Sequence, residues 1–350
     1  MTRVIAGPVS LATAFGHAHE MLVGYALAVV AGNQLPPMSR SRALFLFGLW
    51  LAARLTFIAM SGSIALAFDA AFALVLALHV APRLFGAAKK LRNQALPAVL
   101  VGLCGSAVAY DAAVLVPGGV MLRAILTGIV LLLAALMLFM GGRIIAPAVA
   151  GQFHRQGQSL SARVQPRIEG SLLALIAAAV VFAVHPGFEF LLRIACAAAG
   201  ALAIIRLLRW RLWACRRRPD ILRLGVGYAW LALGLLAVAA TTPGSGRTAA
   251  LHLITIGALG TLTLNVMANT LLLKSRCVPA EARIPTYATA LVGAAAVLRV
   301  MAAFVDERAV DLLIAAAACW SGAFLGVSWL VLHCLLFPAK RTQTSGRRKW

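Results

Sequence analysis

Residues 119–140 read GVMLRAILTGIVLLLAALMLFM and contain one charged side chain, Arg123. About 20 apolar residues in an α-helix cross a hydrocarbon core roughly 30 Å thick. This run therefore predicts a transmembrane helix. Hydropathy and the Pro/Gly-rich breaks between runs predict ten more: 11–32, 42–60, 62–82, 94–110, 169–186, 188–207, 222–241, 248–272, 285–304 and 309–337.

The composition of the whole chain agrees with a membrane protein. Of its 350 residues, 62% are hydrophobic and 12% are charged, against roughly 45–50% and about 25% in soluble domains. Too few charges remain to cover a water-facing surface. We therefore predict an all-α polytopic bundle of about 11 helices, with residues 11–338 as one transmembrane domain, 1–10 as a short periplasmic segment and 339–350 as a basic cytoplasmic tail.

The charge of the chain is strongly positive, with 32 Lys and Arg against 10 Asp and Glu. The odd-numbered connections and the C-terminal tail carry 25 of these 32 basic residues, whereas the even-numbered connections carry only Arg247 and Arg308. Basic residues concentrate in cytoplasmic loops of membrane proteins. The alternation predicts an N-terminus outside and a cytoplasmic C-terminus.

The densest basic segment, Arg206–Arg218, also contains Trp210 and Trp213. Such a segment suits nucleic acid or anionic lipid, but it also suits a topology anchor with its indoles in the headgroup layer. Because the positive charge follows the loops, we favour the anchor. We expect the lipid bilayer, and no nucleic acid, as partner.

Four of the seven histidines fall at the outer ends of predicted helices. They are His17, His19, His185 and His252. Imidazole is a common ligand of haem iron, copper and zinc. This placement predicts a metal site that faces outward.

The segment Gly16-His17-Ala18-His19-Glu20 contains three potential metal-ligating side chains within five residues. Residues two apart on an α-helix point about 200° apart, so helical His17 and His19 cannot bind one metal. An extended backbone at Gly16 would instead place both on one side. In either case Glu20 can orient an imidazole. The alternative is that these are interfacial histidines bonded to loop carbonyls.

Small residues follow His252, namely Gly257, Ala258 and Gly260. They allow close approach of a neighbouring helix or of a flat cofactor, and helix packing is the more common use.

Charged residues within the predicted spans are few, and Arg54, Asp69 and Arg299 lie in the outer halves of theirs. A charge in lipid is costly without a partner. Arg54 can pair with Asp69, or an arginine can hold an anion such as a haem propionate.

Five segments resemble motifs of the NnrS family. They are GHAHEMLVGY at 16–25, FGLWLAARL at 47–55, GGRIIAP at 141–147, GYAWLALGL at 227–235 and LHLITIGALGT at 251–261. We expect the glycine pair of the GGR segment to end its helix. NnrS-like proteins usually have a further N-terminal helix, so we expect this chain to lack it.

The resemblance implies a bacterial inner-membrane protein that binds haem and copper and acts in the response to nitric oxide, denitrification and nitrosative stress. By motif, His17, His19, Glu20 and His252 become the leading metal ligands. His185 joins them by its depth, and Arg54 and Arg299 are candidates to bind the cofactor. Whether nitric oxide is turned over, sensed or only bound stays open.

Two other classes of protein fit the same composition. One is a secondary transporter of a small anionic solute, which Arg54 or Arg299 would bind. The other is a non-catalytic membrane subunit for assembly or sensing.

Overall fold

The computed structural model describes residues 8–35, 38–59, 63–87, 91–116 and 119–336. Within these ranges every regular element is helical. The predicted basic tail, 339–350, and most of the predicted N-terminal segment, 1–10, lie outside the described residues.

Eleven helical spans in the described part of the chain are long and apolar enough to cross a membrane. Two of them contain a π-helical stretch in the middle, so that the first span is α1, π-helix and α2, and the ninth is α10, π-helix and α11. The helices are α1 (Ala14–His19), a π-helix (Glu20–Ala26), α2 (Leu27–Gln34), α3 (Arg40–Ala59), α4 (Ser63–Ala87), α5 (Leu91–Val114), α6 (Gly119–Arg155), α7 (Pro166–Val184), α8 (Glu189–Arg209), α9 (Pro219–Ala240), α10 (Ser245–His252), a second π-helix (Leu253–Gly260), α11 (Thr261–Lys274), α12 (Ile284–Met301) and α13 (Ala309–Leu336).

These spans confirm the eleven predicted runs, and the largest difference lies in α6. That helix continues to Arg155, so the expectation that Gly141 and Gly142 end it is wrong. The two glycines make room for side chains of other helices. A Cβ at Gly141 would clash with the Tyr228 ring, and one at Gly142 would clash with the Arg206 guanidinium.

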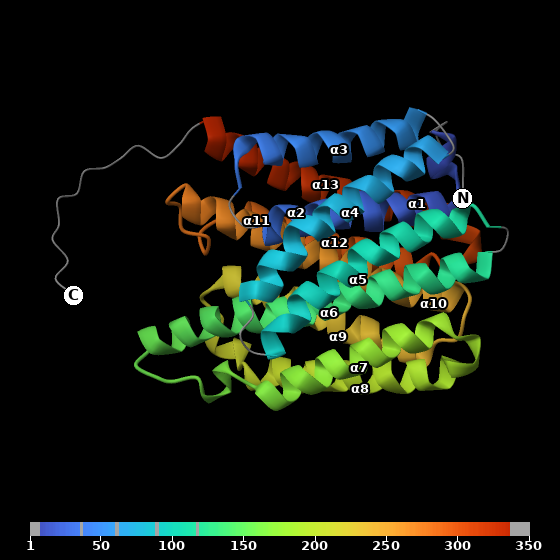
Figure 1. The fold of residues 1–350 in the computed structure, drawn as a ribbon. Helices are drawn as coiled ribbons and strands as arrows, with labels where there is room; N and C mark the ends of the chain where they lie inside the picture. Colours follow the sequence, from blue (N-terminus) through green and yellow to red (C-terminus); the bar gives the residue numbers. More distant parts are fainter. Residues whose placement is uncertain (1–7, 36–37, 60–62, 88–90, 117–118, 337–350) are drawn as a thin grey trace.

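The bundle is centred on α6 and α9, which are the most buried of its spans. Consecutive helices pack as antiparallel neighbours, and α9 also contacts α6, α11 and α12. In Figure 1, α7 and α8 form one side of the bundle, and α3 lies on the opposite side.

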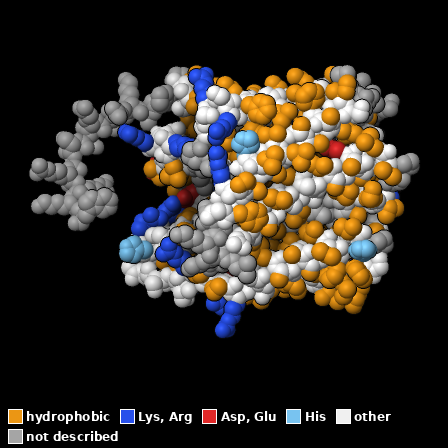
Figure 2. Space-filling model, viewed as in Figure 1, with side chains coloured by type: hydrophobic (Ala, Val, Ile, Leu, Met, Phe, Trp, Pro, Cys, Tyr) orange, Lys and Arg blue, Asp and Glu red, His pale blue; other side chains and the backbone are white. Residues whose placement is uncertain are grey.

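The surface is apolar around the middle and basic toward one end. In the face drawn in Figure 2, Lys and Arg gather toward the end of the bundle at which α13 ends. Large apolar side chains such as Leu78, Phe190 and Leu325 are exposed. Lipid is the solvent that such a surface requires.

The basic segment after α8 is partly core rather than membrane interface. Trp210 is fully buried, and its ring centroid lies 4.9 Å from that of Tyr228. The prediction that its indole lies in the headgroup layer is therefore wrong. Trp213 is exposed, as that prediction requires.

Candidate functional site

The first span begins with helical backbone at the histidine motif. Thr13 caps α1, because its hydroxyl accepts a hydrogen bond from the Gly16 amide at 3.0 Å. His17 and His19 both lie on α1. The extended alternative at Gly16 is therefore wrong, and the two imidazoles have different neighbours.

His19 is fully buried between two aromatic rings. Its ring centroid lies 4.8 Å from that of Phe57 and 5.1 Å from that of Tyr110, both in stacked orientation. The Tyr110 hydroxyl donates to the carbonyl of Phe15 at 3.0 Å, which ties α5 to the start of α1. The rings fix the plane of the imidazole and leave its edge nitrogens facing polar groups.

Those polar groups are three carboxylates from three parts of the bundle. Nδ1 of His19 lies 3.6 Å from Glu20 Oε1, whereas Nε2 lies 3.7 Å from Asp69 Oδ2 and 3.3 Å from Asp111 Oδ1. Neither imidazole nitrogen makes a hydrogen bond of standard geometry to another described residue. The imidazole is thus held by charge and stacking.

Arg54 closes this cluster from α3. Its guanidinium donates to Glu20 and to Asp69, which confirms the predicted pair of Arg54 with Asp69. Gly24 makes the approach possible, since a Cβ there would clash with the guanidinium. Trp50 Nε1 donates to the Gly24 carbonyl at 2.8 Å, so two residues of α3 hold the first span.

Asp111 is the member of this cluster that the sequence did not reveal. The predicted run ended at residue 110, but α5 continues to Val114 and carries Asp111 into the interior, 4% exposed. Neither of its carboxylate oxygens has a hydrogen-bond partner among the described residues. A signal was present in the sequence, because the predicted run of 17 residues was the shortest of the eleven and lay at the lower limit for a span.

The cluster of His19, Glu20, Arg54, Asp69 and Asp111 holds more acidic than basic groups when its carboxylates are ionised. Three carboxylates face one guanidinium and one imidazole. Electrostatic interactions are strong in an apolar interior. The cluster therefore favours an additional positive charge near His19.

His17 belongs to a second group, with His252 and Arg299. The positive charge of Arg299 acts on both imidazoles, and His17 acts on His252. The three residues come from α1, α10 and α12, at the end of the bundle where α1 and α10 lie in Figure 1. His17 and His252 thus lie within electrostatic range of Arg299 and of each other.

The hydrogen bond of His252 defines which of its nitrogens is available. Nδ1 donates to the Thr248 carbonyl at 2.6 Å, since a carbonyl can only accept. Nε2 is then left with its lone pair. Ligating histidines commonly donate their other ring N–H to a carbonyl in this way.

Both histidine motifs run directly into the π-helical stretches, Glu20–Ala26 after His19 and Leu253–Gly260 after His252. Such stretches are rare and occur often at functional sites. Their spans are joined by a hydrogen bond of 3.0 Å between the hydroxyls of Tyr25 and Thr263.

The glycines after His252 serve packing. A Cβ at Gly257 would lie 2.9 Å from the Trp230 ring, and one at Gly260 would lie 2.5 Å from the Trp320 ring. Indoles of α9 and α13 occupy the surface that the small residues open. This confirms the helix-packing interpretation for Gly257 and Gly260.

The remaining predicted site residue, His185, lies apart from both groups. It is exposed at the end of α7, and its ring is tilted against Phe188 at 5.5 Å. No contact in the described part of the chain joins it to His17, His19 or His252.

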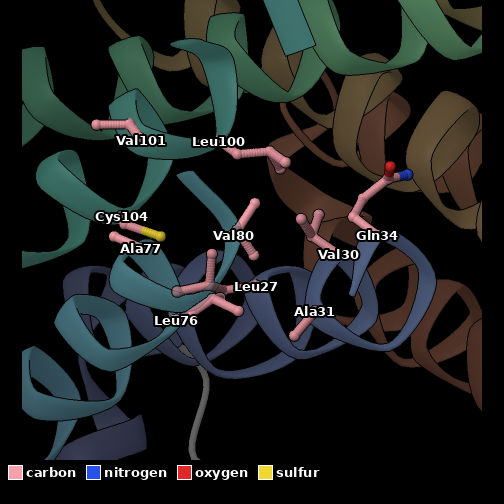
Figure 3. Close-up of a pocket in the computed structure, with 10 residues that line it drawn as sticks. All are labelled: Leu27, Val30, Ala31, Gln34, Leu76, Ala77, Val80, Leu100, Val101 and Cys104. Atoms are coloured by element: carbon pink, nitrogen blue, oxygen red, sulfur yellow. The ribbon is translucent and has the colours of Figure 1, made fainter. Parts of the chain in front are cut away.

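Two observations limit the kind of site. No three His, Cys, Asp or Glu side chains among the described residues are arranged to hold a metal ion. The small pocket in Figure 3, between α2, α4 and α5, has a volume of about 10 Å³ and mostly apolar walls such as Leu27, Leu76 and Val80. It is too small for a cofactor.

The group of His17, His252 and Arg299 is the one whose chemistry fits haem. His17 and His252 would hold the haem iron through imidazole nitrogen, and the Arg299 guanidinium would suit a propionate. Copper also accepts imidazole nitrogen, but the charge of Arg299 disfavours a bare cation there. The donors thus suit a group that carries its own negative charge.

Comparisons with known proteins give one family. No curated protein matches the chain. The family model described as NnrS protein matches residues 3–338. With that match over nearly the whole length, the chain belongs to the NnrS family.

Proposed function

We propose that this multi-pass protein acts in the response to nitric oxide, in the inner membrane of a bacterium, and binds haem and copper near the periplasmic end of its bundle. Membership of the NnrS family supports the nitric-oxide role. The observation that carries the proposal is the convergence of His17, His252 and Arg299 from three helices.

In this proposal His17 and His252 are the ligands, and Arg299 balances the negative charge of the bound group. Thr248 orients the His252 imidazole so that Nε2 faces the ligand position. Haem supplies gas-binding and one-electron chemistry when bound. Copper would bind through His19 and Glu20, and His185 stays a predicted ligand of lower rank.

The cluster around His19 holds the first span in place. Its ion pairs from Arg54 to Glu20 and Asp69 fix the rotation of α1. That rotation aims His17 away from the cluster, toward α10 and α12. Glu20 and Arg54 are thus positioning residues for His17.

The alternative of an anion transporter loses one of its two arginines. Arg54 is occupied by Glu20 and Asp69, so only Arg299 is left to bind an anionic solute. A buried cluster rich in carboxylates would also repel an anion on its way through the bundle.

The test is growth of a deletion strain during exposure to a nitric-oxide donor. We expect the wild-type chain and His154→Ala to restore growth, and His252→Ala and His17→Ala to fail at equal amounts of membrane protein. His154 is the matched control because it lies in the last turn of α6, at the opposite end of the bundle from His17 and His252. Full protection by both His252→Ala and His17→Ala would contradict the proposal.

A further inference from the structure

A second pocket lies at the opposite end of the bundle from His17 and His252. It has a volume of about 430 Å³ and is lined from α6, from the segment before α7, from α7 and from α8. This is large enough for a phosphate-bearing headgroup. Nothing in the proposed function uses it, and the inference below does not depend on that function.

The position of the pocket across the membrane follows from its place along α6. Counting about 20 residues from Gly119 places the inner edge of the hydrocarbon near Met140. Gly142 and Arg143, which line the pocket, follow directly. The pocket therefore lies at the membrane interface, on the side that the basic loops predict to be cytoplasmic.

The lining is positively charged. Arg143, Arg163 and Arg206 face one carboxylate, Glu169. Arg206 is 2% exposed and rigidly held, since it donates to the Leu138 carbonyl at 2.8 Å and to Glu169 at 2.6 Å. Gly142 is required for this placement, because a Cβ would clash with the guanidinium.

The two other arginines are exposed at the pocket. The Arg163 guanidinium makes no hydrogen bond or ion pair with another described residue, and Arg143 lies with its guanidinium 4.5 Å from the Phe139 ring. Guanidinium groups bind phosphate by paired, charge-assisted hydrogen bonds. The exposed pair is thus the recognition element, and buried Arg206 adds a fixed positive charge below it.

The rest of the lining is mostly apolar. Val164 is 57% exposed at the rim, and Leu172 and Leu173 of α7 form the wall beside the charged groups. Free phosphate would gain nothing from that wall. A molecule with a phosphate at one end and acyl chains at the other would use both.

We propose that this pocket binds the headgroup of an anionic phospholipid of the cytoplasmic leaflet. The phosphate lies between Arg143 and Arg163, and its acyl chains run along α7. Basic pockets between membrane helices at this depth hold such headgroups in general.

Native mass spectrometry of the full-length, delipidated protein tests this. The probes are phosphatidylglycerol, phosphatidylcholine with the same acyl chains, and inorganic phosphate. We expect phosphatidylglycerol to bind more tightly than phosphatidylcholine. Arg163→Gln should weaken phosphatidylglycerol by about fivefold, and Arg143→Gln should weaken it comparably.

Arg167→Gln is the matched control, because Arg167 is exposed four residues along the chain from Arg163 and does not line the pocket. It should bind phosphatidylglycerol like the wild type. The proposal is overturned if Arg163→Gln binds like the wild type, if Arg167→Gln loses as much, or if both lipids bind equally. Displacement of the lipid by an equal concentration of inorganic phosphate would also overturn it, since the ligand would then be a soluble anion.

Discussion

Arg54 joins three spans through two ion pairs, to partly buried Glu20 and to fully buried Asp69. Removing one partner of a buried pair leaves an uncompensated charge, at a cost of roughly 3–5 kcal/mol. In a membrane span no water replaces the missing partner. The first, second and third spans therefore depend on this one side chain.

Gly24→Ala tests the space that Arg54 needs. We expect this variant to lower the free energy of unfolding by about 1–3 kcal/mol, because the new Cβ clashes with the guanidinium. Thermal unfolding in detergent measures the change. Gly32→Ala is the control on the same span, since a Cβ there meets nothing within 4 Å. Equal melting temperatures for the two variants would count against the arrangement.

A double-mutant cycle measures the pair of Arg54 with Asp69. Arg54→Gln and Asp69→Asn should each destabilise the protein. The double variant should be more stable than the sum of the two single losses predicts, with a coupling free energy of about 0.5–3 kcal/mol between the two side chains. The same unfolding measurement serves. Additive losses would mean that the two side chains do not interact in the folded protein.

At the residue scale the sequence predicted part of the site. The sequence left open whether His17 and His19 diverge on a helix or share one side of an extended segment, and whether Arg54 pairs with Asp69 or holds an anion. The structure shows the helix and the pair of Arg54 with Asp69. Asp111 was missed because the predicted run ended one residue before it, whereas α5 continues to Val114.

Glycines in the family motifs allow large side chains of other helices to pack close to the backbone. Gly24 accommodates Arg54, Gly142 accommodates Arg206, and Gly257 accommodates Trp230. In each case a small residue of one motif admits a large side chain of another helix. Close approach of this kind stabilises helices in lipid, where no hydrophobic effect draws them together.

Gly260→Ala tests this packing in the ninth span. The added methyl clashes with the Trp320 ring, so we expect a lower melting temperature and a loss of about 1–3 kcal/mol. Trp320→Leu added to this variant should restore part of the loss. Gly246→Ala is the control, because its Cβ would meet only ordinary contacts from 3.5 Å outward. No rescue by Trp320→Leu would exclude this clash as the cause.

At the element scale the sequence predicted all eleven spans. It did not predict the extension of α6 or the two π-helical stretches. The length of α6 depends on Tyr228 and Arg206, which come from other helices and fill the space beside Gly141 and Gly142. Contacts between distant segments leave no signal in local hydropathy.

The molecule as a whole has two ends of different character. The basic loops and the pocket lined by Arg143, Arg163 and Arg206 lie toward one end. The other end carries His17, His252 and the cluster around His19. The positive-inside rule predicts the basic end to be cytoplasmic. The histidine end then faces the periplasm.

Labelling of Cys277 tests this orientation. The thiol is exposed in the connection after α11, at the basic end. A membrane-impermeant maleimide should label it only after cells are permeabilised. Ser245→Cys, exposed at the start of α10, should react in intact cells. Labelling of Cys277 in intact cells would reverse the predicted topology.

The most direct test of the central claim is the absorption spectrum of the purified full-length protein, oxidised and reduced, with iron and copper analysis of the same sample. We predict a Soret band with stoichiometric iron in the wild type and in His154→Ala. His252→Ala should lose most of both while it still inserts and folds. A colourless, metal-free wild type from cells supplied with haem and copper, or a His252→Ala variant with an unchanged spectrum, would contradict a metal centre at His17 and His252.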